Sequence, residues 1–208
     1  KDFQFLVSDR KSIQIIQESK TPFTQAVPEE ILELRYNVSK NEYLILSKSG
    51  IFLLDQNHKF SKVFSGNDLT AFTMADKDRK IIVGTTNGYF TLDAQSYQLI
   101  GAIQTRLPVT YITAVEEIDG QLWFGTNQGA FKLKADTKYD YYYGERWIPN
   151  NLVKQIKSGP DQSVLILTSA GVGQIVFKSM TLADKADFFE QQVRSRNIRN
   201  GFNATRRG

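Results

Sequence analysis

Short apolar runs alternate with small polar turns along the chain, and one arrangement of the two recurs five times. An apolar run ends in a serine or threonine, a turn follows, and in the better copies a second apolar run leaves it. The best copies are residues 122–131 and 81–90, and weaker ones lie at 44–52, 165–171 and 5–11. The hydroxyl residues recur about every 40 residues, a period typical of β-propeller blades. They are Ser8, Ser47, Thr85, Thr126 and Thr168.

Each repeat can be divided into as many as four strands. In the fourth repeat we expect strands at 109–115, 121–125, 130–133 and 138–143, the first two joined by the Asp-Gly turn at 119–120, a strong hairpin signal. The first repeat lacks an opening strand, so we expect the chain to begin inside a blade. The prediction is therefore an all-β propeller of about five blade-like units over residues 1–178. These units either close a small ring or form part of a larger one.

Glycines and hydroxyls give the repeat its physical basis. One set of glycines lies where a hairpin needs a positive φ, which glycine adopts without a Cβ clash. That set is Gly50, Gly88, Gly129 and Gly171. Gly84 and Gly125 lie inside strands, where a missing side chain permits close backbone approach or a bulge. We expect the hydroxyls to bond the turn backbone.

The repeats stop after Lys178, and residues 179–208 are expected to form an amphipathic helix with a loose tail. Thr181 and Asp184 have the spacing of a capping box, with Asp184 in the usual Glu or Gln role. Apolar residues then recur at helical spacing through about residue 196. They are Leu182, Ala186, Phe189 and Val193. We read this helix as an exit from the propeller toward another element.

Composition excludes several classes of function. The chain has 208 residues, of which 41% are hydrophobic, and a net charge of +4 that is concentrated near its end. Without a basic face, nucleic-acid binding is not expected. There is no cysteine, and the one histidine, His58, falls in an expected turn, so we predict neither a metal nor a cofactor. No run is long enough to span a membrane. The chain also lacks an initial methionine and a signal sequence, which suggests a processed piece.

A cluster of aromatic and charged residues is the candidate ligand site. It comprises Tyr141, Tyr143, Arg146 and Trp147. Aromatic ring faces stack on the C–H surfaces of sugars while charged groups hold the hydroxyls, so this cluster suggests carbohydrate binding. The alternative is an outer strand whose tyrosines pack on the next blade.

The remaining candidates are expected to be structural. We predict that Trp123 packs in the core and that Glu116 and Glu117 lie in a solvated turn. Residues 76–78 are spaced like part of a calcium loop but lack its later ligands, so a plain turn is expected. Asn37 and Asn203 begin glycosylation sequons, a weak pointer to secretion.

Residues 122–129, Leu-Trp-Phe-Gly-Thr-Asn-Gln-Gly, resemble the two-component-regulator propeller repeat almost position for position. Residues 81–88 resemble it without the tryptophan, and the resemblance extends loosely over about 3–178. It implies a ligand-binding sensor domain, often outside the bacterial inner membrane and tied to polysaccharide use. The run at 180–202 looks like the connector of propeller proteins that continue into a separate helical domain. The repeat motifs are structural, and no catalytic residue comes with them.

The leading hypothesis is therefore non-enzymatic recognition of a carbohydrate or another small ligand by an extracytoplasmic, periplasmic or secreted, propeller. One alternative is a scaffold that docks a second domain or subunit on its C-terminal helix. Another is a fragment of a larger polysaccharide-related protein whose activity lies in a domain beyond this sequence.

Overall fold

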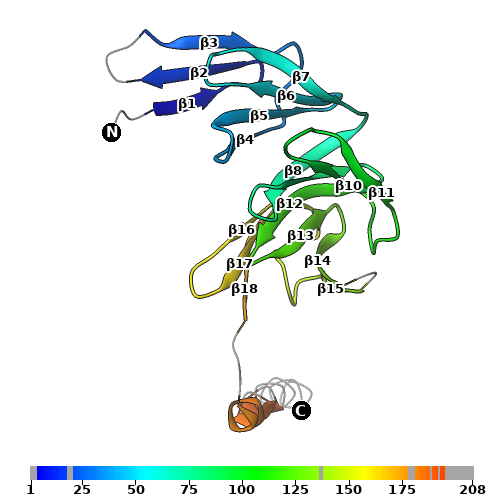
Figure 1. The fold of residues 1–208 in the computed structure, drawn as a ribbon. Coiled ribbons are helices and arrows are strands. Elements are labelled where there is room, and N and C mark those ends of the chain that lie inside the picture. The colour runs from blue at the N-terminus through cyan, green and yellow to red at the C-terminus, as the bar shows by residue number, and fades with distance from the viewer. Residues whose placement is uncertain are drawn as a thin grey trace. The chain divides into compact units, whose positions relative to one another are not determined.

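The computed structural model describes residues 4–17, 21–135, 138–177, 181–187, 189–191 and 193–194 (Figure 1). These residues fall into two compact units, Lys1–Ile175 and Val176–Gly208. In the described parts of the chain the first unit is built from antiparallel strands, and the second contains a helix.

The strands form five sheets, and in each sheet the strand order follows the chain order. The first sheet holds β1 (Gln4–Ser8), β2 (Ser12–Gln17) and β3 (Phe23–Ala26). The second holds β4 (Glu33–Asn37), β5 (Glu42–Ser47), β6 (Gly50–Leu54) and β7 (Phe60–Ser65). The third holds β8 (Leu69–Ala75), β9 (Lys80–Thr85), β10 (Gly88–Asp93) and β11 (Leu99–Gln104). The fourth holds β12 (Ile112–Ile118), β13 (Gln121–Thr126), β14 (Gly129–Ala135) and β15 (Lys138–Tyr142). The fifth holds β16 (Val153–Ser158), β17 (Ser163–Thr168) and β18 (Gly171–Val176).

The repeated hydroxyls bond the backbone of the turns, as the sequence predicted. Thr126 Oγ1 donates to the carbonyl oxygen of Gly129 at 2.7 Å and accepts from the N–H of Gln128 at 3.0 Å. The corresponding bonds to the residue that starts the next strand are made by Ser47, Thr85 and Thr168. Three of these four side chains are fully or almost fully buried. The hydroxyl therefore satisfies turn backbone that the neighbouring sheet removes from water.

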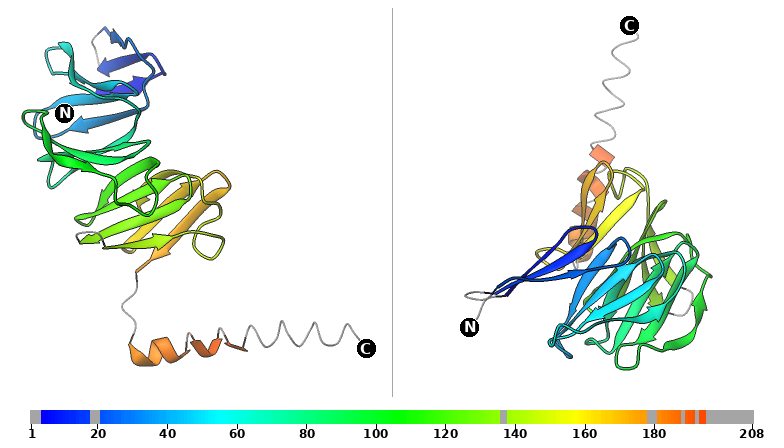
Figure 2. Two further views of the ribbon diagram at one scale, coloured as in Figure 1. Left: turned by 90° about the vertical axis from the view of Figure 1, so that its right-hand side faces the viewer. Right: turned by 90° about the horizontal axis from the view of Figure 1, so that it is seen from above.

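Successive sheets of the first unit follow one another in space (Figure 2), and each pair of them shares an apolar core. Phe72 of β8 packs with Leu46 and Ile51 of the second sheet. Phe124 of β13 packs with Tyr89 of the third sheet. Trp123, predicted to be a core residue, is 1% exposed and packs with the fifth sheet. The apolar side chains on each face of a strand such as β13 are removed from water only because the adjacent sheet covers them.

The two strand-interior glycines lie where an adjacent sheet comes closest. A Cβ on Gly125 would stand 2.4 Å from Cγ1 of Val153, at the start of β16. A Cβ on Gly84 would stand 2.5 Å from Cγ2 of Ile112, at the start of β12. These distances are too short for carbon atoms, so the glycines permit this approach of the sheets, as the sequence suggested.

Two local predictions were wrong. Gly50 does not have a positive φ, unlike Gly88, Gly129 and Gly171. A glycine is needed at position 50 because the neighbouring strand lies close: a Cβ there would lie 2.3 Å from the carbonyl oxygen of Phe64. The strand expected from residue 109 begins only at Ile112. The carbonyl oxygen of Thr110 instead accepts from Gly88 N–H at 2.7 Å, so this segment is hydrogen-bonded to the neighbouring sheet.

The second unit contains the predicted capping box and helix. Residues 182–187, 189–191 and 193–194 are helical. Thr181 N–H donates to Asp184 Oδ2 at 2.8 Å, and Asp184 N–H donates to Thr181 Oγ1 at 3.2 Å. Three residues of the predicted apolar face are exposed: Leu182 at 86%, Phe189 at 65% and Val193 at 55%. The end of the predicted helix, at 195–196, lies outside the described residues.

Candidate ligand pocket on the inner strands

The first strands of the last four sheets lie next to one another, and we call β4, β8, β12 and β16 the inner strands. β12 lies beside both β8 and β16, and β4 lies beside β8. Side-chain hydrogen bonds connect them directly. Thr113 Oγ1 of β12 donates to the carbonyl oxygen of Val153 in β16 at 2.7 Å. Glu33 Oε2 of β4 accepts from the N–H of Phe72 in β8 at 3.0 Å.

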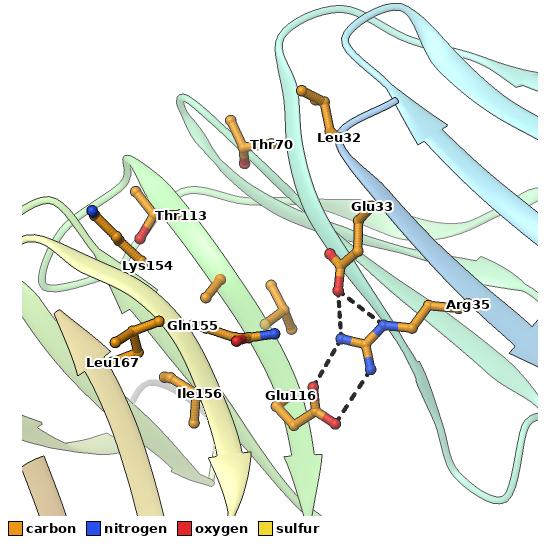
Figure 3. Close-up of a pocket in the computed structure, with 12 residues that line it drawn as sticks. Leu32, Glu33, Arg35, Thr70, Thr113, Glu116, Lys154, Gln155, Ile156 and Leu167 are labelled. Atoms are coloured by element: carbon orange, nitrogen blue, oxygen red, sulfur yellow. Dashed lines mark hydrogen bonds and ion pairs between the residues drawn. The ribbon is translucent and has the colours of Figure 1, made fainter. Parts of the chain in front are cut away.

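A pocket of about 210 Å³ opens on these strands (Figure 3). Its apolar lining includes Leu32, Ile156 and Leu167, whereas Glu33, Arg35 and Glu116 supply charge. The volume is below the range of about 300–1,000 Å³ typical of drug-sized ligands. The pocket therefore suits a ligand smaller than a drug-sized molecule.

Three of the inner strands have a bulge at the same place near their start. The register with the next strand shifts between Leu69 and Ala71, between Ile112 and Ala114, and between Val153 and Gln155. The extra residues are Thr70, Thr113 and Lys154, and all three line the pocket. A β-bulge redirects a side chain locally, and bulges are frequent beside functional sites. The repeat thus places two threonines and one lysine around a single space.

Thr70 and Lys154 differ from Thr113 in their bonding. The buried Thr70 Oγ1 has no hydrogen-bond partner among the described residues. Lys154 is exposed, and within those same residues it forms no ion pair. The exposed ammonium group is available to a ligand, and an unpaired buried hydroxyl costs free energy until it is bonded.

A charged network joins three inner strands across the pocket (Figure 3). Arg35 Nη2 lies 2.6 Å from Glu33 Oε1 and 2.8 Å from Glu116 Oε2. Lys157 Nζ also lies 2.8 Å from Glu116 Oε2. Arg35, Glu116 and Lys157 hold equivalent positions in their sheets, because each pairs with the residue three places before the repeated hydroxyl. Those paired residues are Leu44, Trp123 and Leu165.

Burial changes the acid–base behaviour of this network. Burial raises the pKa of the Glu33 carboxyl, outweighing the attraction of Arg35 and the hydrogen bond from Phe72 N–H. For Arg35, burial acts to lower the pKa, but the hydrogen bond and charge of Glu116 and the charge of Glu33 raise it overall. The guanidinium therefore remains charged and holds both carboxylates in place.

The structure divides the four sequence-predicted aromatic-site residues into two pairs. Tyr141 and Tyr143 stack with ring centroids 5.0 Å apart, and Tyr141 packs toward the third sheet. Arg146 lies over the ring of Trp147, which contacts Tyr142 edge-on at 5.5 Å. Tyr142 packs with the fifth sheet, on the opposite face of β15. Tyr143 is 59% exposed and Trp147 is 44% exposed, so each pair keeps one accessible ring.

The remaining sequence candidates have clear positions. Glu116 and Glu117 lie in β12 rather than in a solvated turn, and Glu117 Oε1 accepts from Asp76 N–H at 3.0 Å. His58 is a turn residue that stacks on Phe23. Asn37 is fully buried, and its Nδ2 donates to Glu42, so a glycan on that nitrogen is incompatible with this fold. Asn203 lies outside the described residues.

Sequence reasoning missed the charged network. Glu33, Arg35 and Lys157 were not singled out, although charged residues inside an otherwise apolar opening strand are an available signal. Over the described ranges, no group of three or more His, Cys, Asp or Glu side chains could hold a metal ion. In the same part of the chain no helix has the length and hydropathy needed to cross a membrane.

Comparison with known proteins identifies the type of fold. No family model matches the sequence, and neither does any curated protein. The extracellular domain of a hybrid two-component system from B. thetaiotaomicron is similar in structure, with a TM-score of 0.70 and 14% identity. The match covers 86% of this chain and 26% of that one. The chain thus spans about a quarter of the length of that structure.

Two other solved structures extend this likeness. PorZ, a surface component of the type-IX secretion system of Porphyromonas gingivalis, matches with a TM-score of 0.61 and 12% identity, over 83% of this chain and 25% of PorZ. The WD40 β-propeller domain of Doa1 matches with a TM-score of 0.58 and 11% identity, over 81% of this chain and 58% of that one. The five antiparallel sheets therefore have a propeller-like fold.

Proposed function

We propose that this chain is a non-enzymatic recognition module that binds a saccharide in the pocket on its inner strands. The observation that carries the proposal is the convergence of Thr70, Thr113 and Lys154 at three equivalent bulges. Hydroxyl, ammonium and carboxylate groups beside an apolar wall are the groups that orient a sugar ring. The charged network keeps the pocket wall in place before a ligand arrives, which lowers the entropic cost of binding.

The structural likeness supports a sensing role outside the cytoplasm. The similar two-component domain is extracellular, and so is a second such domain from the same organism, which has a TM-score of 0.62. A third similar structure, from the same organism, is an auxiliary nutrient binding protein. We accordingly propose an extracytoplasmic, ligand-sensing function for this chain, with carbohydrate as the ligand class.

Calorimetric titration of the full chain with a panel of neutral and acidic mono- and disaccharides tests the proposal. Lys154→Gln removes the available ammonium group, and we expect its affinity for a bound saccharide to fall by about 10-fold, the loss typical of one charge-assisted hydrogen bond. Lys11→Gln, an exposed lysine away from the pocket, is the matched control. Absence of binding to every saccharide, or equal binding by Lys154→Gln, contradicts the proposal.

The aromatic pairs at and just after the end of β15 provide a second place for the same ligand class. Tyr143→Ala and Trp147→Ala distinguish it from the pocket, because both side chains are accessible and their loss should not disturb the sheets. If either variant loses saccharide binding at an unchanged melting temperature while Lys154→Gln retains it, the site lies at these aromatic pairs.

A docking platform is the alternative function, favoured by the exposed apolar face of the C-terminal helix. Leu182 and Val193 lie on that face, and large exposed apolar side chains usually mark interfaces. Under this alternative, Leu182→Asp should abolish capture of a second domain or subunit while saccharide binding is unchanged.

A further inference from the structure

A second hollow, of about 320 Å³, lies between the second and third sheets at the turn that follows β4. Its lining comes from the end of β4 and from three turns: Asn37 ends β4, Lys40 follows it, Lys77 and Arg79 lie between β8 and β9, and Gln95 follows β10. None of these residues lines the pocket on the inner strands. The hollow is therefore separate from the pocket to which the saccharide is assigned above.

A buried amide with one unused acceptor forms part of the wall. Asn37 is fully buried, and its Nδ2 donates to Glu42 Oε1 at 3.1 Å. That bond fixes the orientation of the amide, because a carboxylate only accepts. Oδ1 is consequently the other end, and it has no hydrogen-bond partner in the described parts of the chain. A buried acceptor without a partner costs about 1–3 kcal/mol, so a donor from outside the protein is favoured there.

The groups around Asn37 are held by a hydrogen-bonded network that joins the two sheets. Tyr97 OH donates to the buried Glu42 carboxylate. Lys40 Nζ donates to the Gln95 carbonyl oxygen at 2.9 Å and to Tyr97 OH at 3.2 Å. Burial, and then the Glu42 hydrogen bond, raise the pKa of Tyr97, so its hydroxyl remains a donor. The wall is therefore rigid before any ligand arrives.

Cationic groups border the same hollow. Lys77 is exposed and forms no ion pair within the described residues. Arg79 is held by Asp76 through Nη2 and Nε. The acidic residues at the hollow are Asp78 and Asp93, and Asp93 Oδ1 accepts from the N–H groups of Gln95 and Ser96. An available ammonium group and an unused buried acceptor at one hollow favour a ligand with both an anionic group and a hydroxyl.

We infer that this hollow is a binding site for a small hydroxylated carboxylate of the sugar-acid class. A ligand hydroxyl donates to Asn37 Oδ1, and the ligand carboxylate pairs with the Lys77 ammonium group. Asp78 accepts from a further hydroxyl. Neutral sugars lack the group that Lys77 binds, and simple carboxylates lack the donor that Asn37 requires, so both groups must be present on one molecule.

Titration of the full chain with glucuronate, followed by NMR of side-chain amides, tests this site directly. Glucuronate should shift the Asn37 Nδ2 resonances, whereas glucose and acetate should leave them unchanged at the same concentration. Lys77→Gln should weaken glucuronate binding by about 10-fold, as expected for one charge-assisted contact. Lys59→Gln, an exposed turn lysine distant from the hollow, should bind as the parent does.

Three results overturn the inference. Glucuronate that leaves the Asn37 resonances unmoved shows that water alone serves Oδ1. Acetate that binds as tightly as glucuronate shows an unspecific anion contact. Equal affinity of Lys77→Gln and the parent removes the proposed ion pair. Because Lys154→Gln alters only the pocket on the inner strands, it should leave the Asn37 response intact, which keeps this test independent of the proposed function.

Discussion

Several side chains in this protein form hydrogen bonds or ion pairs with a neighbouring sheet or loop rather than with their own strand. Glu29 precedes the second sheet and binds across to the β5–β6 turn, where Ser49 Oγ donates to Oε1 and Ser49 N–H donates to Oε2 at 3.3 Å. Lys62 of β7 lies 3.4 Å from the same carboxylate. Hydrogen bonds from Ser49 and Ser47, then the charge of Lys62, lower the Glu29 pKa to about 2. The Glu29 carboxylate therefore holds the β5–β6 turn in place through these bonds.

The lowered pKa of Glu29 predicts how the free energy of unfolding depends on pH. Its folded pKa lies below the ordinary value of 4.5, so the ionised group stabilises the fold above pH 4.5. That contribution is lost as the pH falls from 4.5 toward 2. Urea unfolding should show Glu29→Gln to be less stable than the parent at pH 7, with the difference shrinking at pH 3. Glu30→Gln, which removes an exposed pair with Arg10, is the control. A difference that does not change with pH contradicts the assignment.

At the scale of elements, the sequence was informative wherever a residue type has one physical use. The hydroxyl before each tight turn and the glycines of the hairpins identified the second and third strands of the last four sheets. The inner strands were less well predicted, because their bulges have no sequence signature of their own. Thr70 and Thr113 share one structural position with Lys154, a residue of a quite different type. Register with the neighbouring strand, not composition, placed them in one pocket.

Close approach of elements can be tested at Gly125. A methyl group there would meet Val153 Cγ1 at 2.4 Å, so Gly125→Ala forces β13 and β16 apart. We expect a loss of about 1–3 kcal/mol in the free energy of unfolding, the usual cost of overpacking a core. Val153→Ala in the same chain should recover part of that loss by making room. Denaturant titration of the two single variants and the double variant measures this coupling, and simple additivity would count against it.

At the scale of the whole molecule, the chain consists of a sheet unit and a helix-containing unit. The sheet unit is stabilised by cores shared between successive sheets, and every residue of these cores belongs to that unit. Stability of the first unit should therefore not depend on the second.

A chain ending at residue 178 tests this separation. We expect its far-ultraviolet circular dichroism to keep the strand signal and its melting temperature to stay within about 2 °C of the parent, less than the shift that a loss of 1 kcal/mol gives. A truncated chain that aggregates, or melts well below the parent, shows that the helix is part of the folded core. Saccharide titration of the same truncated chain then reports whether the pocket is intact.

The sequence by itself determined the repeat, the strand-rich fold and the exit into a helix, because local turn chemistry and hydrophobic periodicity are written in adjacent residues. It also placed Trp123 in the core. Only the tertiary structure decided which polar groups meet. Arg35 and Glu116 are far apart in the chain, and Asn37 of the second sheet borders one hollow with Lys77 of the third. Such groupings arise from the packing of one sheet on the next, and no window of neighbouring residues contains that information.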